Sequence, residues 1–152
     1  TMEIYYQGEG KFLLKLKQIK VEVGQEIKVS PETGEPYVIS GPGEYEIKGV
    51  SVTGWQAGEK EVIYLIEMDE LAIGYFVNNG AKLTEKNWDH LEGMDVLLVG
   101  CEDDGSLVKK IDPSVAVVMK AMDESTARRE KKLVLKKAEL PEETAVFVLD
   151  KI

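Results

Sequence analysis

The sequence predicts an α/β (α+β) fold in which strands dominate the first two thirds of the chain. Two observations support this prediction. Apolar and polar residues alternate in several short runs before Gly80, as they do in half-buried strands. After Gly80, compact apolar runs alternate with segments that begin with helix-capping residues. The 152 residues fit a single domain, residues 1–152, which is long enough to bury a core.

The strands of the first two thirds are separated by residues that form turns. Gly24-Gln25 interrupts the alternating stretch of residues 17–29, and a loop rich in turn-forming residues follows at 31–36. Two apolar runs joined by a short polar connection predict a hairpin buried on both faces. The predicted strands of this part are residues 4–6, 12–16, 19–23, 27–29, 44–47, 50–53, 62–66 and 71–76.

Residues 40–50 form the most informative segment of the chain. Gly41-Pro42-Gly43 predicts a tight turn, because proline fixes its own φ and glycine accepts a positive φ. Residues 44–47 alternate as a strand does, Lys48-Gly49 interrupts them, and the alternation resumes at residues 50–53. None of these residues is an obvious nucleophile or metal ligand.

The last third of the chain predicts strands that alternate with helices. Thr84 is a suitable N-cap for a short helix over residues 84–91, and residues 107–111 predict another helical turn. The longest predicted helix runs from Glu124 to Ala138, with Asp123 or Ser125 as its cap. Compact apolar runs predict buried strands at residues 95–99, 114–119 and 145–149.

Composition argues against several classes of function. The formal net charge of −9 and the pI near 4.8 disfavour nucleic acid or an anionic membrane as partner, since both need a basic face. The one candidate basic patch, Lys131-Lys132 with Lys136-Lys137, falls in the predicted long helix, where a solvated helix face is expected. A single cysteine, Cys101, cannot form an internal disulfide. With no apolar run of membrane length and no signal-peptide pattern, we expect a cytoplasmic protein.

Several motifs, taken in order, resemble one family. They are the first strand ending at Gly8, the segment GPGEYEI (41–47), the hairpin of residues 63–76, the strand of residues 94–99, Ile111-Asp112-Pro113, and LPEET (140–144). Together they resemble the small bacterial and archaeal branch of the metallo-β-lactamase-fold hydrolases. This resemblance covers nearly the whole chain and implies an αββα sandwich, here shortened in its N-terminal half. It also implies a site at one edge of the sandwich, where histidines and aspartates hold metals that activate water.

The metal ligands of that family are missing from the matching positions. Its histidine-rich signature belongs within residues 17–39, which contain no histidine. Glu9 stands where the family has a histidine after the first strand, and Tyr75 and Asn78 stand in place of a later histidine and a bridging aspartate. Lys120 occupies the position of the last histidine, and its ammonium has no lone pair for a metal. We therefore expect Glu9, Tyr75, Asn78 and Lys120 to line a vacated pocket, with no metal and no cofactor.

The remaining candidates have plain structural explanations. His90 is expected on the surface of a helix, away from every matched ligand position. The three acids Glu102-Asp103-Asp104 should raise the pKa of Cys101, and they form a solvated loop more often than a cation site. Trp55 precedes a loop that would stand near the vacated pocket.

These observations predict a degenerate, non-catalytic member of the family that acts as a binding or structural module, expected to form a homo-oligomer. Losing the histidine-bearing segment should also remove a helix, which would uncover a sheet edge or apolar surface. One alternative is a metal-dependent hydrolase whose ligands are Glu9, Asn78, the acidic loop, or groups from a neighbouring subunit. Another is a small-molecule module in which Lys120 binds a carboxylate or phosphate.

Overall fold

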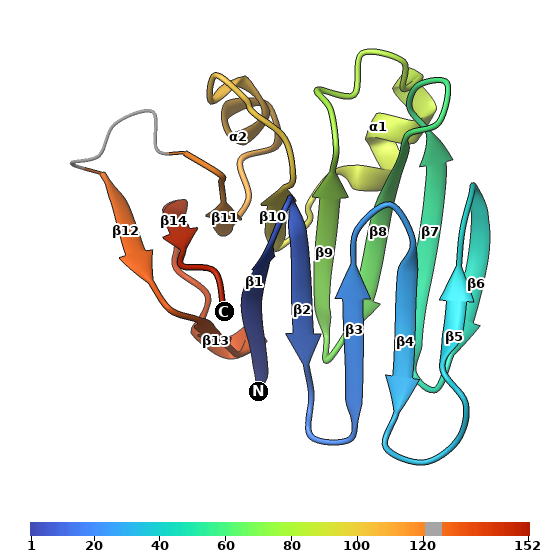
Figure 1. Cartoon of the computed structure of the whole chain (residues 1–152). Helices are drawn as coiled ribbons and strands as arrows, with labels where there is room; N and C mark the ends of the chain where they lie inside the picture. Colours follow the sequence, from blue (N-terminus) through green and yellow to red (C-terminus); the bar gives the residue numbers. More distant parts are fainter. Residues whose placement is uncertain (121–125) are drawn as a thin grey trace.

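Two β-sheets pack face to face in the computed structural model of the chain (Figure 1). The structure describes residues 1–120 and 126–152. A six-stranded sheet has the order β13-β1-β2-β3-β4-β5, and an eight-stranded sheet has the order β12-β14-β11-β10-β9-β8-β7-β6. The predicted α/β sandwich is therefore confirmed.

The six-stranded sheet is antiparallel throughout. Its alternation has the predicted register, because Ile4, Leu14 and Val21 face the core while Glu3, Lys15 and Lys20 face outward. Residues 17–39, where the family signature was expected, form three complete strands and the turns between them, with no helix. The strands are β1 (Met2–Gly8), β2 (Lys11–Lys15), β3 (Ile19–Val23), β4 (Ile27–Pro31), β5 (Tyr37–Ile39) and β13 (Leu133–Leu135).

The eight-stranded sheet is antiparallel on one side and parallel on the other. The predicted turn at residues 41–43 leads into its edge strand, and Gly41 has the positive φ, +93°, that the turn requires. The strands are β6 (Gly43–Ile47), β7 (Val50–Gln56), β8 (Val62–Met68), β9 (Leu71–Phe76), β10 (Val96–Val99), β11 (Val115–Val117), β12 (Ala127–Glu130) and β14 (Ala145–Leu149).

Two short α-helices lie on the outer face of the eight-stranded sheet (Figure 1). They are α1 (Glu85–Leu91) and α2 (Ser106–Ile111), so both predicted short helices are confirmed. Thr84 caps α1 through a capping box with Asn87, in which each side chain bonds the backbone N–H of the other residue. Neither helix is long or apolar enough to cross a membrane.

The apolar residues form two layers of core. The larger layer fills the space between the sheets and includes Phe12, Ile66 and Tyr64, whose side chains are fully buried. The second layer lies between the eight-stranded sheet and the helices and includes Phe76 and Leu91. Strands β8 and β9 contribute to both layers, which explains why their sequences are apolar on both faces.

The long helix predicted from Glu124 to Ala138 is wrong for its described part. Residues 126–138 instead contain β12, β13 and the start of a 3₁₀ turn, η1 (Lys137–Glu139). The first two residues of the prediction and both proposed caps lie outside the described residues. Pairing with β14 and β1 outweighs the weak helix preference of this Lys-rich segment, and the buried–exposed–buried pattern of Leu133, Val134 and Leu135 has the period of a strand.

One end of the sandwich gathers the connections that could form a site. The β1–β2 and β3–β4 turns meet the loops that follow β7, β9 and β10 at this end, at the top of Figure 1. In sheets with parallel strands, ligands bind outside the carboxyl ends of those strands. This edge, which we call the loop end, is therefore the candidate site.

Candidate functional site

The four residues predicted to line a vacated pocket all lie at the loop end, in adjacent hollows. Glu9 and Tyr75 line one open cleft of about 760 Å³, which also contains Gly100. Asn78 lines a second hollow beside residues 101–104, and Lys120 lines a third on the other side of the same loop. The structure thus brings Glu9 and Tyr75 together and leaves Asn78 and Lys120 next to them.

Tyr75 joins the two sheets at the base of the cleft. Its ring is 2% exposed, and its hydroxyl donates a 2.6 Å hydrogen bond to the carbonyl oxygen of Gly10, in the β1–β2 turn. The backbone N–H of Gly10 in turn donates to the hydroxyl oxygen of Tyr6 at 3.1 Å. Both polar groups of Gly10 are therefore satisfied by tyrosine side chains.

Tyr64 makes a second bond of the same kind. It is the direct cross-strand partner of Tyr75 on β8, it is fully buried, and its hydroxyl donates to the carbonyl oxygen of Gln25 at 3.2 Å. Gln25 lies in the β3–β4 turn. Tyr64 and Tyr75, which we call the tyrosine pair, thus tie two turns of the six-stranded sheet to neighbouring strands of the other sheet.

Glycine at positions 10 and 100 allows this closure. A Cβ atom on Gly10 would lie 2.5 Å from the carbonyl oxygen of Gly100, and one on Gly100 would lie 2.6 Å from the Tyr75 hydroxyl. Gly10 also has a φ of +74°, which side chains rarely adopt. The two backbones therefore approach more closely than any other residue type would permit.

The environment of Tyr75 keeps its hydroxyl protonated. Burial raises the pKa of Tyr75 to about 12, with smaller contributions from Cys101 and Tyr6. Burial also raises the pKa of Tyr64. A protonated phenol that donates to a carbonyl is a structural group, because a tyrosine metal ligand would have to be a phenolate.

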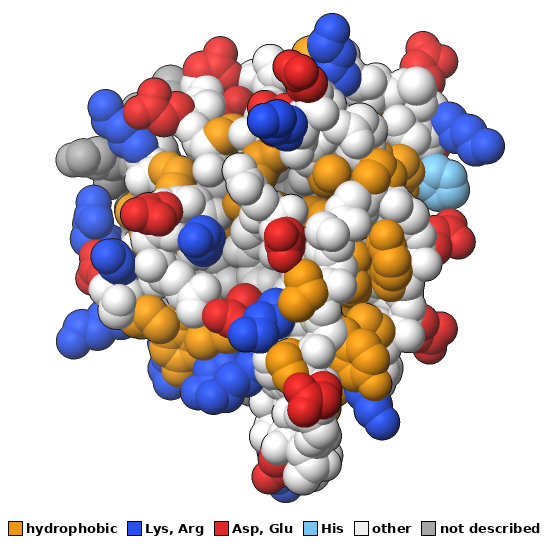
Figure 2. All heavy atoms as spheres, turned by 45° about the vertical axis from the view of Figure 1, so that its right-hand side comes forward, with side chains coloured by type: hydrophobic (Ala, Val, Ile, Leu, Met, Phe, Trp, Pro, Cys, Tyr) orange, Lys and Arg blue, Asp and Glu red, His pale blue; other side chains and the backbone are white. Residues whose placement is uncertain are grey.

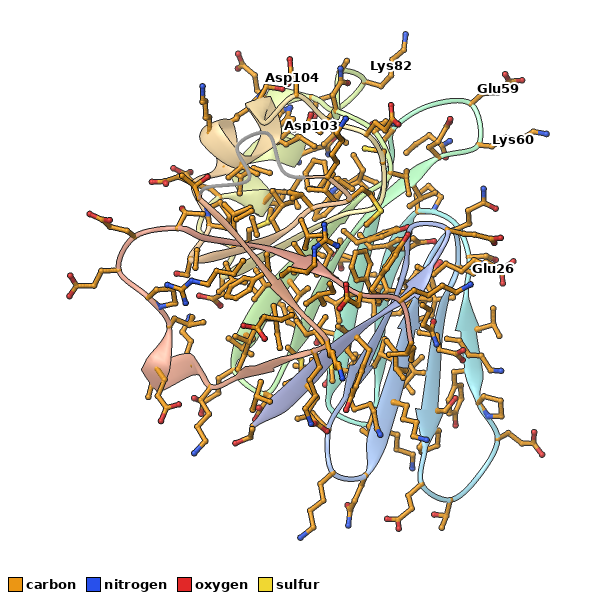
Figure 3. All side chains as sticks on the ribbon, turned by 60° about the vertical axis from the view of Figure 1, so that its left-hand side comes forward. Glu26, Glu59, Lys60, Lys82, Asp103 and Asp104 are labelled. Atoms are coloured by element: carbon orange, nitrogen blue, oxygen red, sulfur yellow. The ribbon has the colours of Figure 1, made fainter. Side chains whose placement is uncertain are left out.

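Charged side chains surround the open part of the cleft. They are Glu9, Lys11, Glu22, Glu26, Lys28 and Glu61. Lys28 pairs with Glu22 at 3.8 Å, and Glu61 accepts from the backbone N–H of Lys60 at 3.1 Å. Figure 3 shows Glu26 on its turn of the six-stranded sheet, with Glu59 and Lys60 projecting from the β7–β8 loop. Carboxylates therefore outnumber ammonium groups in this cleft.

Both the nitrogen and the oxygen of the Asn78 amide form hydrogen bonds with backbone groups. Its nitrogen donates to the carbonyl oxygen of Ala57, and its oxygen accepts from the N–H of Gly80, each at 2.8 Å. Asn78 thereby fixes the β7–β8 loop against the segment that follows β9. Its amide groups are used in folding the loops, as the turn-forming role of asparagine predicts.

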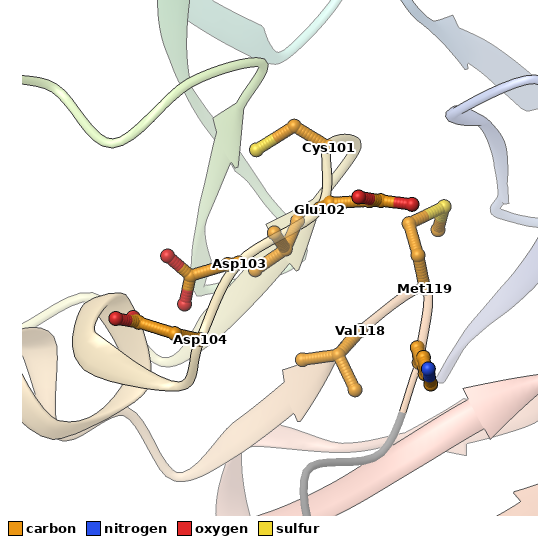
Figure 4. A pocket seen from close by; sticks show the side chains of 8 residues that line it. Cys101, Glu102, Asp103, Asp104, Val118 and Met119 are labelled. Carbon is orange, nitrogen blue, oxygen red and sulfur yellow. The ribbon is translucent and has the colours of Figure 1, made fainter.

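The acidic loop serves mainly to begin α2. Asp103 accepts from the backbone N–H groups of Gly105 and Leu107, and Asp104 accepts from that of Ser106. In Figure 4 both of these carboxylates turn toward α2, whereas Glu102 points toward Met119. Hydrogen bonds from Ser106 lower the pKa of Asp104. The solvated-loop interpretation of residues 102–104 is therefore supported by these contacts.

Cys101 and Lys120 line the same hollow of about 380 Å³. Burial, with the charge of Asp103 as a smaller cause, raises the pKa of the Cys101 thiol, in the direction expected from the adjacent acids. Such a thiol is a poor nucleophile at neutral pH. Lys120 is exposed and shares its hollow with Glu102, so an anion bound there would meet a carboxylate as well.

His90 lies on the surface, as expected. It is exposed on α1 and stacks on Trp55 of β7, with ring centroids 6.0 Å apart. Figure 2 shows the single histidine at the rim of the molecule. Trp55 packs with the outer core layer under the helices, so neither ring belongs to the cleft.

The side chains at the loop end do not fit a family-type metal centre. The matched positions offer the exposed Glu9 carboxylate, a protonated phenol, a backbone-bonded amide and an ammonium, so Glu9 alone among them is a good ligand for Zn²⁺. Among the described residues, no three His, Cys, Asp or Glu side chains are grouped so that they could hold a metal ion.

Sequence reasoning identified Tyr75 and missed its partners. Tyr64, Gly10 and Gly100 carry the closure, but the two strands and two turns that bring them together are far apart in the sequence. The sequence offered one local signal: β8 and β9 are mostly apolar strands, and each contains a single tyrosine.

Comparisons with known proteins agree with this architecture. A family model described as a β-lactamase superfamily domain matches residues 13–123. A 2.00 Å crystal structure from Thermotoga maritima, described as a proposed Zn-dependent hydrolase of the metallo-β-lactamase superfamily, aligns with a TM-score of 0.72 at 17% sequence identity. The alignment covers 98% of this chain and 99% of that one, so the likeness extends over the whole fold. Curated protein sequences gave no significant match.

We predict that Tyr75→Phe lowers the free energy of unfolding by about 1–2 kcal/mol, because it leaves the buried carbonyl of Gly10 without its donor. Urea unfolding followed by circular dichroism measures this loss. Tyr45→Phe is the matched control, since the Tyr45 hydroxyl makes a 3.2 Å bond to Pro42 that is exposed and local. Equal effects of the two substitutions would contradict a special role for Tyr75.

We also predict a loss of stability at alkaline pH that depends on Tyr75. Its pKa in the folded state, about 12, exceeds the ordinary value of 10.0. Its contribution is therefore fully present below pH 10 and is lost as the pH rises through 12. In urea unfolding across this window, the wild type should lose stability more steeply than Tyr75→Phe. Parallel curves for the two proteins would show that Tyr75 ionises as freely as in the unfolded chain.

Proposed function

This chain belongs to the metallo-β-lactamase superfamily, and we propose that within it the protein acts as a non-catalytic binding or structural module. The observation that carries the proposal is the bond from the Tyr75 hydroxyl to Gly10, at a position where the family resemblance implies a metal-ligating histidine. This bond and that of Tyr64 supply the cross-sheet ties at the loop end. Closure of that end then needs no metal ion.

The other matched positions support the same proposal. The amide of Asn78 is hydrogen-bonded to two backbone groups. The carboxylates of Asp103 and Asp104 accept hydrogen bonds from backbone N–H groups at the start of α2. These side chains would have to give up hydrogen bonds to reach a metal, which costs free energy for each buried group left unpaired. A hydrolytic centre would therefore compete with the fold itself.

A metal-dependent hydrolase is the second candidate. It is favoured by the carboxylates of Glu9, Glu26 and Glu61 on the open cleft, since oxygen ligands suit hard cations. The description of the Thermotoga structure as a proposed Zn-dependent hydrolase points the same way. In this candidate a neighbouring subunit completes the ligand set.

A third candidate, a small-molecule module that uses Lys120, has weaker support. Glu102, Asp103 and Asp104 line the same hollow, and together they oppose the binding of a carboxylate or phosphate group at Lys120. The candidate predicts that Lys120→Ala abolishes binding of such an anion.

Self-association is part of the proposal. Strand β5 is an edge of the six-stranded sheet, and its Tyr37 and Val38 are 47% and 57% exposed. Unpaired strand edges with exposed apolar side chains favour pairing between chains. A homo-oligomer that covers β5 would bury this surface.

The metal content of the protein separates the first two candidates. We predict far less than one zinc or manganese atom per chain in untagged protein purified from metal-supplemented cells, measured by elemental analysis. We also predict no rise in melting temperature with added Zn²⁺ or Mn²⁺. A ligand at one hundred times its Kd would stabilise the fold by about 2.7 kcal/mol, a shift that is easy to detect.

His90→Ala is the control for incidental metal binding. Any weak zinc signal that disappears in this variant belongs to the surface histidine and not to the loop end. One metal atom per chain that remains in this variant, with a rise in melting temperature on adding the metal, would contradict the non-catalytic proposal and favour the hydrolase.

We predict that the protein self-associates and that Val38→Lys weakens the association, because a charge on an edge strand opposes pairing. Sedimentation velocity over a range of concentrations measures this. Ala81→Lys, which adds the same single positive charge at an exposed loop position, is the control for a change in surface charge. A wild type that stays monomeric at high concentration would count against self-association.

A further inference from the structure

The outer face of the six-stranded sheet is a second surface of interest. Among the described residues, both α-helices lie on the other sheet, and none covers this face (Figure 1). Its side chains come from alternate positions of β1 to β4 and from the residue that precedes β13. We call it the open face, and its residues are Glu3, Tyr5, Lys11, Leu13, Lys15, Lys20, Glu22, Lys28 and Lys132.

The open face is positively charged on an acidic protein. It carries five lysines and two glutamates, whereas the whole chain has a formal net charge of −9. Lys132 forms an ion pair with Glu3 at 2.6 Å, and Lys28 forms one with Glu22 at 3.8 Å. Both glutamates of the open face therefore have an ion-pair partner. Lys11, Lys15 and Lys20 have no ion pair with any described residue.

Two of these lysines face each other, although Lys15 also lies opposite Glu3 of β1. Lys15 and Lys20 are direct cross-strand partners of β2 and β3. Like charges in this position destabilise a sheet, and the neighbouring pair Glu22 and Lys28 shows the arrangement that avoids the cost. An acidic group bound between Lys15 and Lys20 would relieve their repulsion.

An apolar pair lies at the centre of the lysines. Tyr5 and Leu13 are cross-strand partners and are half-buried on the open face. The ammonium groups of Lys15 and Lys132 lie 5.6 Å and 5.9 Å from the centre of the Tyr5 ring. An apolar centre within a charged rim is the usual anatomy of a protein interface.

We propose that the open face binds an acidic segment of another protein, with an apolar side chain seated on Tyr5 and Leu13 and carboxylates on Lys11, Lys15 and Lys20. A protein segment fits better than nucleic acid, because the face has no arginine and the chain as a whole would repel a polyanion. This inference names a partner for the proposed binding module. Apart from Lys11, which also lines the cleft at the loop end, the residues it needs lie outside that cleft, and none is a matched ligand position, so it stands or falls independently of the metal measurement.

The test is an NMR titration of the full-length, isotope-labelled protein with a synthetic peptide in which glutamate pairs flank a leucine. Amide shifts should concentrate on β1 to β3, around Tyr5, Leu13 and Lys15. Raising the ionic strength from roughly 0.05 M to 0.5 M should weaken binding, because exposed charge pairs are screened. The matched peptide with lysine in place of glutamate should not bind.

The variant Lys15→Glu/Lys20→Glu should raise the Kd for this peptide by about tenfold or more, since it replaces two attractive charge contacts with repulsive ones. The single variant Lys20→Glu keeps the test independent of folding. It replaces a like-charge pair with an opposite-charge pair, so its melting temperature should not fall while peptide binding weakens. Lys82→Glu makes the same change of net charge elsewhere and should bind as the wild type does.

Three outcomes would overturn the proposal. They are the absence of shifts on the open face, unchanged affinity in the double variant, and equal or tighter binding of a DNA duplex at the same face. The last result would assign the face to nucleic acid instead.

Discussion

The loop end of the sandwich depends on two hydrogen bonds that cross from one sheet to the other. Tyr75 and Tyr64 are neighbours on β9 and β8, and their hydroxyls donate to the turns at Gly10 and Gln25. A buried carbonyl that lost its donor would carry the full cost of desolvation, so these bonds fix where the turns lie. The close approach of Gly10 and Gly100 follows from that placement.

The loops at this end of the fold are held by side-chain hydrogen bonds to the backbone. In the resembled enzymes, loops at one edge converge on metal ions, whose coordination holds them in position. Here phenol hydroxyls, the Asn78 amide and the Asp103 carboxylate hold the corresponding loops through backbone groups. The contacts that hold the described loops are therefore hydrogen bonds, and the cationic open face is the surface that we propose for a partner.

Local patterns in the sequence were sufficient for most of the fold. Alternation and apolar runs located β1 to β4 and β6 to β9 but missed the short β5, Thr84 marked the start of α1, and the turn at Gly41 was recognised from its residue types. Local patterns gave the wrong structure for residues 126–138, because β12 and β13 form by pairing with other strands, β14 and β1. The same limit hid Tyr64, Gly10 and Gly100. It also hid the open face, because Lys15 and Lys20 are separated in the sequence and become neighbours only when β2 pairs with β3.

Amide hydrogen exchange at Gly10 tests most directly whether tyrosine hydroxyls, and not a metal, hold the loop end closed. The Gly10 N–H donates to Tyr6 and reports on the turn that Tyr75 anchors. Exchange should be equally slow before and after treatment with a chelator, and about thirtyfold faster in Tyr64→Phe/Tyr75→Phe, since the two lost bonds are together worth about 2 kcal/mol. Faster exchange after chelation, with little change in the double variant, would contradict this view of the protein.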